Sequence, residues 1–268
     1  MLNREGITAL ENPLARRVEL HETLASTQER AKKLALADPG APHGTLVVSK
    51  VQTGGRGRLG RSWGSPAGGL WMSLVLRLDL PLRLAPRVTP AAAVGVAKAL
   101  REMGVNTRIK WPNDILVGGA GGRKICGILA ESGGHASNTG GHASNNFIVL
   151  GVGINANVDP RDLEAQPRKT ATLRSELGHD VDILELLETV LTKLDFELGR
   201  LHDFGAVIED WRALDCTLGR RVRVQRFGEV VEGAAVDLGP GGALVIRTND
   251  GIVEVFEGDV EHLYQGGT

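Results

Sequence analysis

Three arginines alternate with four glycines in the stretch from Gln52 to Trp63, which reads QTGGRGRLGRSW. Arg56, Arg58 and Arg61 each carry a permanent charge on a forked guanidinium that matches phosphate oxygens. The glycines let backbone N–H groups approach an anion and disfavour both helix and core strand. The stretch therefore predicts a loop that grips phosphate. Its composition alone leaves two alternatives open, a solvated linker and an arginine-glycine RNA-binding tract.

The spacing of the glycines excludes two common nucleotide-binding loops. A P-loop has the pattern G-x-x-x-x-G-K-[ST], and a dinucleotide-binding turn joins a strand to a helix through G-x-G-x-x-G. Here the apolar pattern predicts strands on both sides of the loop, over residues 44–51 and 70–78. Trp63 ends the loop in a chain with only 4% aromatic residues. Its ring is suited to stack on a nucleotide base, with anchoring of the loop as the alternative.

A second candidate segment, Lys110 to Asp114, reads KWPND at the end of a strand expected over residues 107–111. Pro112 cannot donate to a sheet ladder, so we expect the chain to turn there. Asn113 and Asp114 then stand at a strand end, where binding residues of α/β proteins often lie. Asn and Asp are also common turn formers, so these residues alone leave a binding role and a structural role open.

A third segment, RKICGILAE over residues 123–131, has the pattern of a strand. Lys124 stands at its start, where a lysine is usually an edge or surface charge. Gly127 would let the backbone come close to a ligand. Cys126 has no evident histidine partner and sits within the strand, so we expect a small buried side chain rather than a nucleophile.

Two further candidates stand at the ends of elements. Ser26 and Glu29 form a capping box, which predicts a helix that runs to about residue 37. A helix N-terminus also offers polar groups at a fixed position, so capping by Ser26 would not exclude a second role for its hydroxyl. Asn155 ends an apolar strand expected over residues 147–155, which should be buried on both faces.

Two long helices are expected between these segments and after them. Thr89 precedes Pro90, which predicts an N-cap and a first helical position for a helix that reaches Gly104. Asp182 and Glu185 form a capping box that opens an amphipathic helix expected to end near residue 203. Alanine and glycine dominate the first helix, so its neighbours can approach closely.

The character of the sequence changes at about residue 215. After it, short strands alternate with glycine-rich turns, and Asn249-Asp250-Gly251 is a strong hairpin signal. Such a run of short strands predicts a small β-barrel. We therefore expect an α+β protein with a mixed-sheet domain over residues 1–214 and a small barrel domain over residues 215–268.

Composition limits the kinds of function that remain. The 268 residues carry a net charge of −1, so no overall field favours nucleic acid. Cys126 and Cys216 are too few for a disulfide framework and fit a reducing cytoplasm. With no apolar signal core and no run of 18 apolar residues, we expect a cytoplasmic protein without membrane contact. The repeat GGHASNT-GGHASNN, within residues 133–146, predicts a tolerant surface loop rather than a metal site.

Five ordered motifs resemble those of the biotin protein ligases. They are Gln52, the run from Gly55-Arg56-Gly57-Arg58 to Trp63, KWPND at 110–114, K-x-x-G-I at 124–128 and GVGIN at 151–155. Together they are far more specific than any one of them. The resemblance implies a mixed-sheet catalytic domain of the biotin and lipoate ligase type, followed by a barrel similar to a Src-homology-3 domain.

The resemblance also implies a role for each candidate residue. Biotin would contact Ser26, Thr27, Gln52, Arg56, Gly57, Lys124 and Gly127, and the nucleotide or the adenylate would contact Arg58, Arg61, Trp63, Lys110, Asn113, Asp114 and Asn155. Lys124 and Arg58 would be the catalytic residues. Asp114 would be the partner of Mg²⁺.

The implied enzyme uses ATP, biotin and Mg²⁺ to form biotinyl-AMP, and then transfers biotin to a lysine of the biotin carboxyl carrier domain of an acyl-CoA carboxylase. A lipoate or octanoate ligase is the nearest alternative, because it shares the fold and the adenylation chemistry. A non-catalytic RNA-binding protein is the alternative from another class.

Partners other than the carrier domain are constrained less strongly. Many relatives begin with a helix-turn-helix that binds DNA, but only about fifteen residues precede the first expected strand here, so we expect no DNA binding. The sequence leaves open whether the protein forms a homodimer and which carboxylase it serves.

Overall fold

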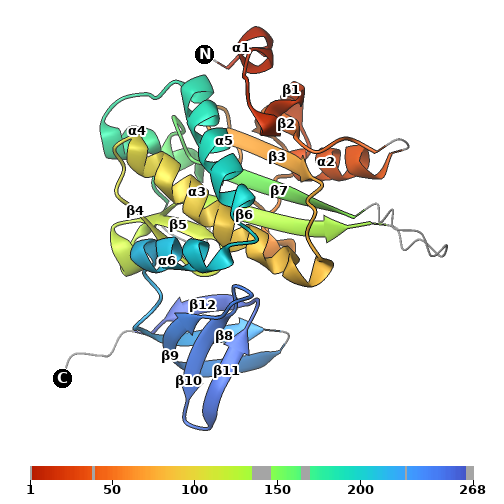
Figure 1. The fold of residues 1–268 in the computed structure, drawn as a ribbon. Coiled ribbons are helices and arrows are strands. Elements are labelled where there is room, and N and C mark those ends of the chain that lie inside the picture. The colour runs from red at the N-terminus through yellow and green to blue at the C-terminus, as the bar shows by residue number, and fades with distance from the viewer. Residues whose placement is uncertain (1, 38–39, 135–145, 164–169, 227, 264–268) are drawn as a thin grey trace, which may run out of the picture.

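The computed structural model describes residues 2–37, 40–134, 146–163, 170–226 and 228–263. They form a seven-stranded sheet with helices on both faces and a five-stranded sheet at the C-terminal end (Figure 1). The larger sheet has the order β1-β2-β3-β7-β6-β5-β4, and only β1 and β2 pair in parallel. Its strands are β1 (Arg17–Leu24), β2 (Thr45–Gln52), β3 (Leu70–Leu76), β4 (Thr107–Lys110), β5 (Asp114–Val117), β6 (Arg123–Gly133) and β7 (Phe147–Ile154). The expected α+β fold with a mixed sheet is confirmed.

The register of this sheet places small and polar residues of neighbouring strands side by side. Ser73 of β3 is opposite Gly151 of β7, and Gly153 of β7 is opposite Gly127 of β6. Asp114 at the start of β5 is opposite the same Gly127. Since side chains alternate between the two faces of a strand, these positions share one face of the sheet.

Helix α2 (Thr27–Leu36) lies on that face and covers only part of it. It buries Ala31, Leu34 and Ala35 against apolar side chains of β2, β3 and β7. At its start the hydroxyl of Ser26 accepts a hydrogen bond from the N–H of Glu29 at 3.4 Å, so the expected N-cap is confirmed. The rest of this face, over β7, β6 and β5, is left for the loops.

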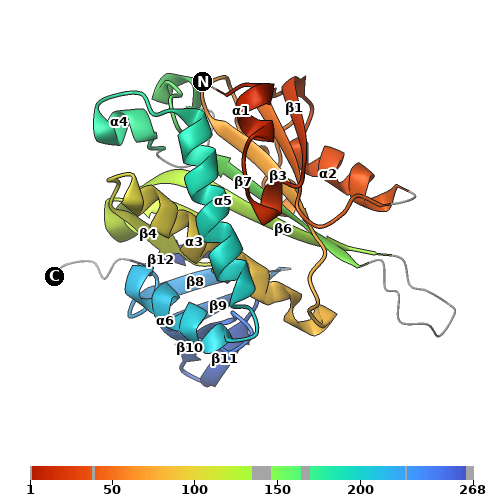
Figure 2. The same cartoon turned by 45° about the horizontal axis from the view of Figure 1, so that its top comes forward.

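The opposite face is covered by α3 (Val88–Glu102), α5 (Ile183–Gly199) and α6 (Phe204–Leu214) (Figures 1 and 2). Helix α3 lies next to the sheet, and its Gly95 lets α5 come close: an added Cβ there would lie 3.0 Å from the carbonyl oxygen of Lys193. The remaining short helices are α1 (Arg4–Thr8), α4 (Leu173–Leu177), and the 3-10 turns η1 (Pro13–Ala15), η2 (Arg58–Gly60), η3 (Leu82–Arg87), η4 (Gly119–Gly121) and η5 (Pro160–Leu163).

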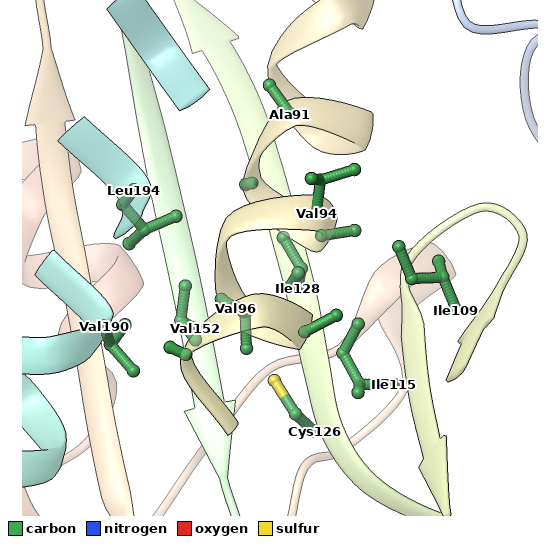
Figure 3. Close-up of a cluster of buried hydrophobic side chains, with 14 of the residues drawn as sticks. Ala91, Val94, Val96, Ile109, Ile115, Cys126, Ile128, Val152, Val190 and Leu194 are labelled. Atoms are coloured by element: carbon green, nitrogen blue, oxygen red, sulfur yellow. The ribbon is translucent and has the colours of Figure 1, made fainter. Parts of the chain in front are cut away.

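The core between α3 and the sheet is aliphatic. Figure 3 shows Val94 and Val96 of α3 close to Ile128 and Val152 of the sheet, with Cys126 beside them. Burial raises the pKa of the Cys126 thiol far above its usual range, so the thiolate does not form at neutral pH. The expectation that Cys126 is a structural side chain agrees with this.

Two expected helix boundaries differ in the structure. Helix α3 begins at Val88 and continues from η3, because Arg87 already has helical φ and ψ of −63° and −22°. The prediction that Thr89 is an N-cap is therefore wrong. Helix α5 has the expected N-cap at Asp182, whose carboxylate accepts from the N–H of Leu184 at 2.7 Å, but the helix ends at Gly199 rather than near residue 203.

The C-terminal strands form an antiparallel sheet in the order β11-β10-β9-β8-β12. They are β8 (Arg221–Arg226), β9 (Glu229–Leu238), β10 (Leu244–Thr248), β11 (Gly251–Val255) and β12 (Asp259–His262). Helix α6 ends at Leu214, and the N–H of Cys216 then donates to the carbonyl of Ile109 at 2.9 Å. This sheet therefore follows a short connection that is itself bonded to β4.

Trp111 joins the two sheets at the turn after β4. Its backbone N–H donates to the hydroxyl of Thr217 at 3.0 Å, and its indole N–H donates to the carbonyl of Gly242 at 3.2 Å. The indole is 2% exposed. The C-terminal sheet thus holds the residues that follow Trp111 in one position.

In the part of the chain that the structure describes, no helix combines the length and the apolar character that a membrane span requires. Most of the GGHASN repeat, residues 135–145, lies outside the described residues, so the loop expected there stays a prediction.

Candidate active site

A cavity opens on the face of the larger sheet that carries α2, with an empty volume of about 1060 Å³, its open mouth included. We call residues 52–63 the arginine loop and residues 110–114 the KWPND turn. Both segments line the cavity together with the start of α2, strands β3, β6 and β7, and residues 258–260 of the C-terminal sheet. The predicted site residues that line it are Ser26, Thr27, Gln52, Arg56, Gly57, Arg58, Arg61, Trp63, Asn113, Asp114, Lys124 and Gly127.

Uncharged polar side chains bond to one another at the end of the cavity over β2 and β3, which we call the neutral end. The backbone N–H of Thr27 donates to Oε1 of Gln52 at 2.8 Å, and the Thr27 hydroxyl lies 3.1 Å from the same oxygen. The Thr27 and Ser73 hydroxyl oxygens are 2.9 Å apart. Nε2 of Gln52 donates to the hydroxyl of Ser65 at 2.8 Å. Such a network suits a neutral ligand that carries N–H and C=O groups.

The middle of the cavity has a floor of glycines under the ring of Trp63. An added Cβ at Gly153 would lie 2.6 Å from the indole nitrogen of Trp63, and one at Gly127 would lie 3.0 Å from its six-membered ring. Only glycine lets the ring lie this close to the sheet. The indole N–H is buried and has no hydrogen-bond partner among the described residues. The predicted stacking of Trp63 on adenine stays a prediction.

The end of the cavity over β6 and β5 is charged. Nζ of Lys124 lies 2.6 Å from Oδ1 of Asp114 and 4.7 Å from the ring centre of Trp63. The two charged side chains are only 17% and 10% exposed, so water screens them weakly. An ammonium has three N–H donors. Lys124 can therefore bind an anionic oxygen of a ligand while it keeps Asp114.

Arg58 contacts both sheets from the wall of the charged end. Its Nη1 donates to Oδ1 of Asn113 at 3.1 Å and to the carbonyl of Gly258 at 3.4 Å. Burial lowers the pKa of the Arg58 guanidinium, while the carboxylates of Asp114 and Glu257 act in the opposite direction. A guanidinium that has lost water gains most from an anionic partner. Arg58 is thus prepared to bind a phosphate or an acyl phosphate.

The other two arginines of the loop reach outward to carboxylates. Arg56 pairs with Glu29 of α2, and Arg61 pairs with Asp259 of β12. The side chains of Arg56 and Arg61 are 42% and 51% exposed, so each pair adds little to stability. The pairs nevertheless fasten the arginine loop to α2 on one side and to the C-terminal sheet on the other.

Two predicted residues do not line the cavity. Lys110 is opposite Asp114 in the β4–β5 ladder. Asn155 is fully buried, and its Nδ2 donates to the carbonyls of Ala171 at 3.1 Å and Lys124 at 3.4 Å. It therefore fixes the start of β6, from which the Lys124 side chain projects. The predicted contacts of Lys110 and Asn155 with the nucleotide stay predictions.

The described residues do not form a metal site of their own. Among them no group of three or more His, Cys, Asp or Glu side chains is placed to hold an ion. The carboxylate of Asp114 is already paired with Lys124. Mg²⁺ commonly needs one or two carboxylates and takes its other ligands from phosphates and water. Asp114 would then be one ligand beside the phosphates of a nucleotide, and the assignment of Mg²⁺ to Asp114 stays a prediction.

Several lining residues were not identified from the sequence. Ser73 is one, although its signal was present, since it is the single polar residue in the buried strand LWMSLVL. Gln28 is another, buried at the start of α2. Gly258, Asp259 and Val260 come from the C-terminal sheet, and no local pattern could have linked them to a loop about 200 positions earlier.

The chain matches the Biotin/lipoate A/B protein ligase family over residues 20–155 and the Biotin protein ligase C terminal domain over residues 217–263. It is 35% identical over 246 residues to the bifunctional ligase/repressor BirA of Bacillus subtilis, covering 90% of this chain and 72% of that protein. It is 32% identical over 243 residues to the biotin–[acetyl-CoA-carboxylase] ligase of Mycobacterium tuberculosis, covering 87% of this chain and 85% of that protein.

The fold is also found among solved structures. The biotin protein ligase from Aquifex aeolicus in complex with biotin and ATP is 28% identical in sequence, with a TM-score of 0.71. The similarity covers 92% of this chain and 98% of that chain, so it includes both sheets.

Proposed function

Since the chain belongs to the biotin protein ligase family, we propose that it activates biotin as biotinyl-AMP and transfers it to a lysine of a biotin carboxyl carrier domain. The similar ligase from Mycobacterium tuberculosis is named for acetyl-CoA carboxylase, which makes an acyl-CoA carboxylase the proposed source of that domain. ATP supplies the AMP. The protein is a ligase, and the proposal concerns its steps and its acceptor.

The observation that carries the proposal is the change of chemistry along the cavity. Its neutral end offers amide and hydroxyl groups from Thr27 and Gln52, which match a cyclic urea. Its charged end offers Lys124 and Arg58 to a carboxylate. Two strand spacings separate β3 from β6, which carries Lys124, and they amount to about 10 Å. This length suits a ligand with a urea ring at one end, an aliphatic chain, and a carboxylate at the other.

In the proposed first step, a carboxylate oxygen of biotin attacks the α-phosphorus of ATP, and the bond to pyrophosphate breaks. Negative charge gathers where the carboxylate meets the phosphates. Lys124 and Arg58 line that part of the cavity, and their N–H groups would hold the oxygens in line and offset their repulsion. The exposed Arg56 and Arg61 would exchange their carboxylate partners for phosphate oxygens as the arginine loop closes.

In the proposed second step, the amine of the carrier lysine attacks the acyl carbon of biotinyl-AMP, and AMP leaves with the bonding electron pair. Lys124 would donate a hydrogen bond to the carbonyl oxygen as negative charge develops on it. The low exposure of Lys124 and Asp114 strengthens that interaction. Arg58 would hold the phosphate of the adenylate, so that the anhydride reacts with the lysine before water reaches it.

The experiment that tests the proposal follows biotin to the acceptor. The purified chain is incubated with biotin, ATP, magnesium salt and a biotin carboxyl carrier domain, and the domain is analysed by mass spectrometry and peptide mapping. We expect one biotin on one lysine, and none on a domain in which that lysine is replaced by arginine. If the domain acquires no biotin while lipoate or octanoate is attached to a lipoyl domain, the biotin assignment is wrong.

A further inference from the structure

Glu131 of β6 is a half-buried carboxylate that does not line the cavity but bonds to a residue that does. Its Oε2 accepts a hydrogen bond from Nε2 of Gln28 at 2.9 Å, and its Oε1 accepts one from Nζ of Lys32 at 2.7 Å. Burial raises the pKa of Glu131, but the bonds from Lys32 and Gln28 outweigh it, so the pKa lies below its usual range. The group is ionised at neutral pH, and as a carboxylate it can only accept hydrogen bonds.

The amide of Gln28 has one favourable orientation in this setting. Its Nε2 lies 2.9 Å from the Glu131 carboxylate and 3.1 Å from the carbonyl of Val149, which are both acceptors. A flipped amide would put its oxygen against both of them. Oε1 of Gln28 therefore faces Ser73, whose hydroxyl donates to it at 3.1 Å. This bond uses the only proton of Ser73.

The direction of the Ser73 hydrogen bond also determines which bonds Thr27 can make in the cavity. The hydroxyl oxygens of Ser73 and Thr27 are 2.9 Å apart, and Ser73 has no proton left for this contact, so it acts as an acceptor. Oε1 of Gln52 is a second acceptor, 3.1 Å from the Thr27 hydroxyl. Thr27 has one hydroxyl proton to donate to these two acceptors. Neither Ser73 nor Oε1 of Gln52 donates a proton to the lone pairs of the Thr27 hydroxyl oxygen. The neutral end therefore holds more acceptors than protons.

We infer that Glu131 is a positioning residue that fixes the hydrogen-bond polarity of the neutral end, through Gln28 and Ser73, so that this end selects an N–H donor. The inference rests on the proposed function, in which the ureido ring of biotin occupies the neutral end. One ureido N–H then donates to the hydroxyl oxygen of Thr27. A ring that presents an oxygen at this point would face acceptors only, and its binding would be weaker.

The substitution Glu131→Gln tests the chain of contacts because the two carboxylate oxygens have different partners. Lys32 requires an oxygen, so the new amide nitrogen must face Nε2 of Gln28, donor against donor. The Gln28 amide then loses its fixed orientation. When it turns, it donates to Ser73, and the Ser73 proton is then donated to Thr27. Thr27 no longer donates to Ser73, so its own proton becomes available to a ligand oxygen.

The probes are biotin and two cyclic carbamate analogues, in each of which one ureido N–H is replaced by oxygen. Dissociation constants are measured by titration calorimetry on the full chain. For the wild type, we expect one of the two analogues to bind about 10- to 100-fold more weakly than biotin, as for a buried acceptor left without its donor. In Glu131→Gln this ratio should fall below about 3-fold. The KM for ATP should not change.

Two further variants decide whether Glu131 acts through Gln28. Gln28→Met also frees the Ser73 proton, so it should lower the ratio to the same level, and Glu131→Gln should have no further effect in that background. Glu22→Gln makes the same chemical change at an exposed carboxylate of β1 that pairs with Lys50, and it should keep the ratio of the wild type. These variants also keep the test decisive if Glu131→Gln does not fold.

The possible results separate this inference from the proposed function. If the wild type does not bind biotin in calorimetry, the proposed function fails. If the wild type discriminates between biotin and a carbamate analogue, and Glu131→Gln discriminates equally well, the role of Glu131 is wrong while the function stands. A ratio that falls by an additional factor in the double variant would show that Glu131 acts by another route, and the relay would be refuted.

Discussion

Replacing Lys124 by methionine removes one charge from the charged end and keeps an unbranched side chain that is one atom shorter. In the structure Nζ of Lys124 is 17% exposed and bonded to Asp114 at 2.6 Å. A hydrogen bond from such a group to a ligand carboxylate is worth about 1.5–3 kcal/mol. Each 1.4 kcal/mol is about tenfold in affinity. We therefore expect the Kd of biotin to rise about 10- to 150-fold in Lys124→Met.

The neutral biotin amide separates this effect from a general disturbance of the cavity. It has the same ring and chain, but a carboxamide replaces the carboxylate. If Lys124 acts on the carboxylate, wild type and variant should bind the amide within about threefold of each other. Equal losses for biotin and its amide, measured by titration calorimetry, would show that Lys124 does not act on the carboxylate.

The substitution also leaves the Asp114 carboxylate, which is 10% exposed, without its ammonium partner. Loss of one partner of a buried pair costs up to about 3–5 kcal/mol of stability. The double variant Lys124→Met/Asp114→Asn removes the second charge as well. It should regain most of the free energy of unfolding in urea titrations and should still bind biotin weakly, which separates the two roles of Lys124.

The variant Arg58→Gly should release biotinyl-AMP, which then labels bystander lysines. If rapid filtration shows that this variant releases biotinyl-AMP as slowly as the wild type does, Arg58 does not hold the intermediate. Gly153→Ala places a Cβ 2.6 Å from Nε1 of Trp63 and should raise the KM for biotin about 5- to 100-fold, whereas Gly205→Ala, with no atom within 4 Å, should not change it. Burial raises the pKa of Asp215 from 3.8 to about 6. The contribution of this group to the free energy of unfolding is fully present below pH 3.8 and is lost as pH rises through 6. The free energy of unfolding of Asp215→Asn, compared with that of the wild type at the same pH, should therefore rise by about 3 kcal/mol between pH 4 and pH 7. A stability difference that does not vary with pH in urea unfolding would exclude this.

Most of the larger sheet could be predicted because its strands are marked by local patterns. The apolar run of β3 and the alternating β6 each have a period that one strand determines by itself. The cap of α2 at Ser26 is likewise a local signal. The start of α3 was placed too late, because η3 continues into the helix and needs no capping side chain.

The cavity was predicted in part, and the missing part has a physical reason. The arginine loop could be predicted from its composition, because a run of glycine and arginine is unsuited to a helix or a core strand. The pairing of Arg61 with Asp259 joins positions far apart in the chain, so no window of sequence contains it. The orientation of Gln28 depends on Glu131 and Val149 at once, and therefore on the folded sheet.

Exchange of labelled pyrophosphate into ATP, with biotin, lipoate and octanoate as parallel acids, tests directly whether this protein activates biotin. It reports the first step alone and needs no carrier domain. We expect exchange that depends on biotin, is at least about tenfold slower in Lys124→Met at low biotin concentration, and is absent with the other two acids. Exchange with lipoate or octanoate but not with biotin would show that the protein activates another acid.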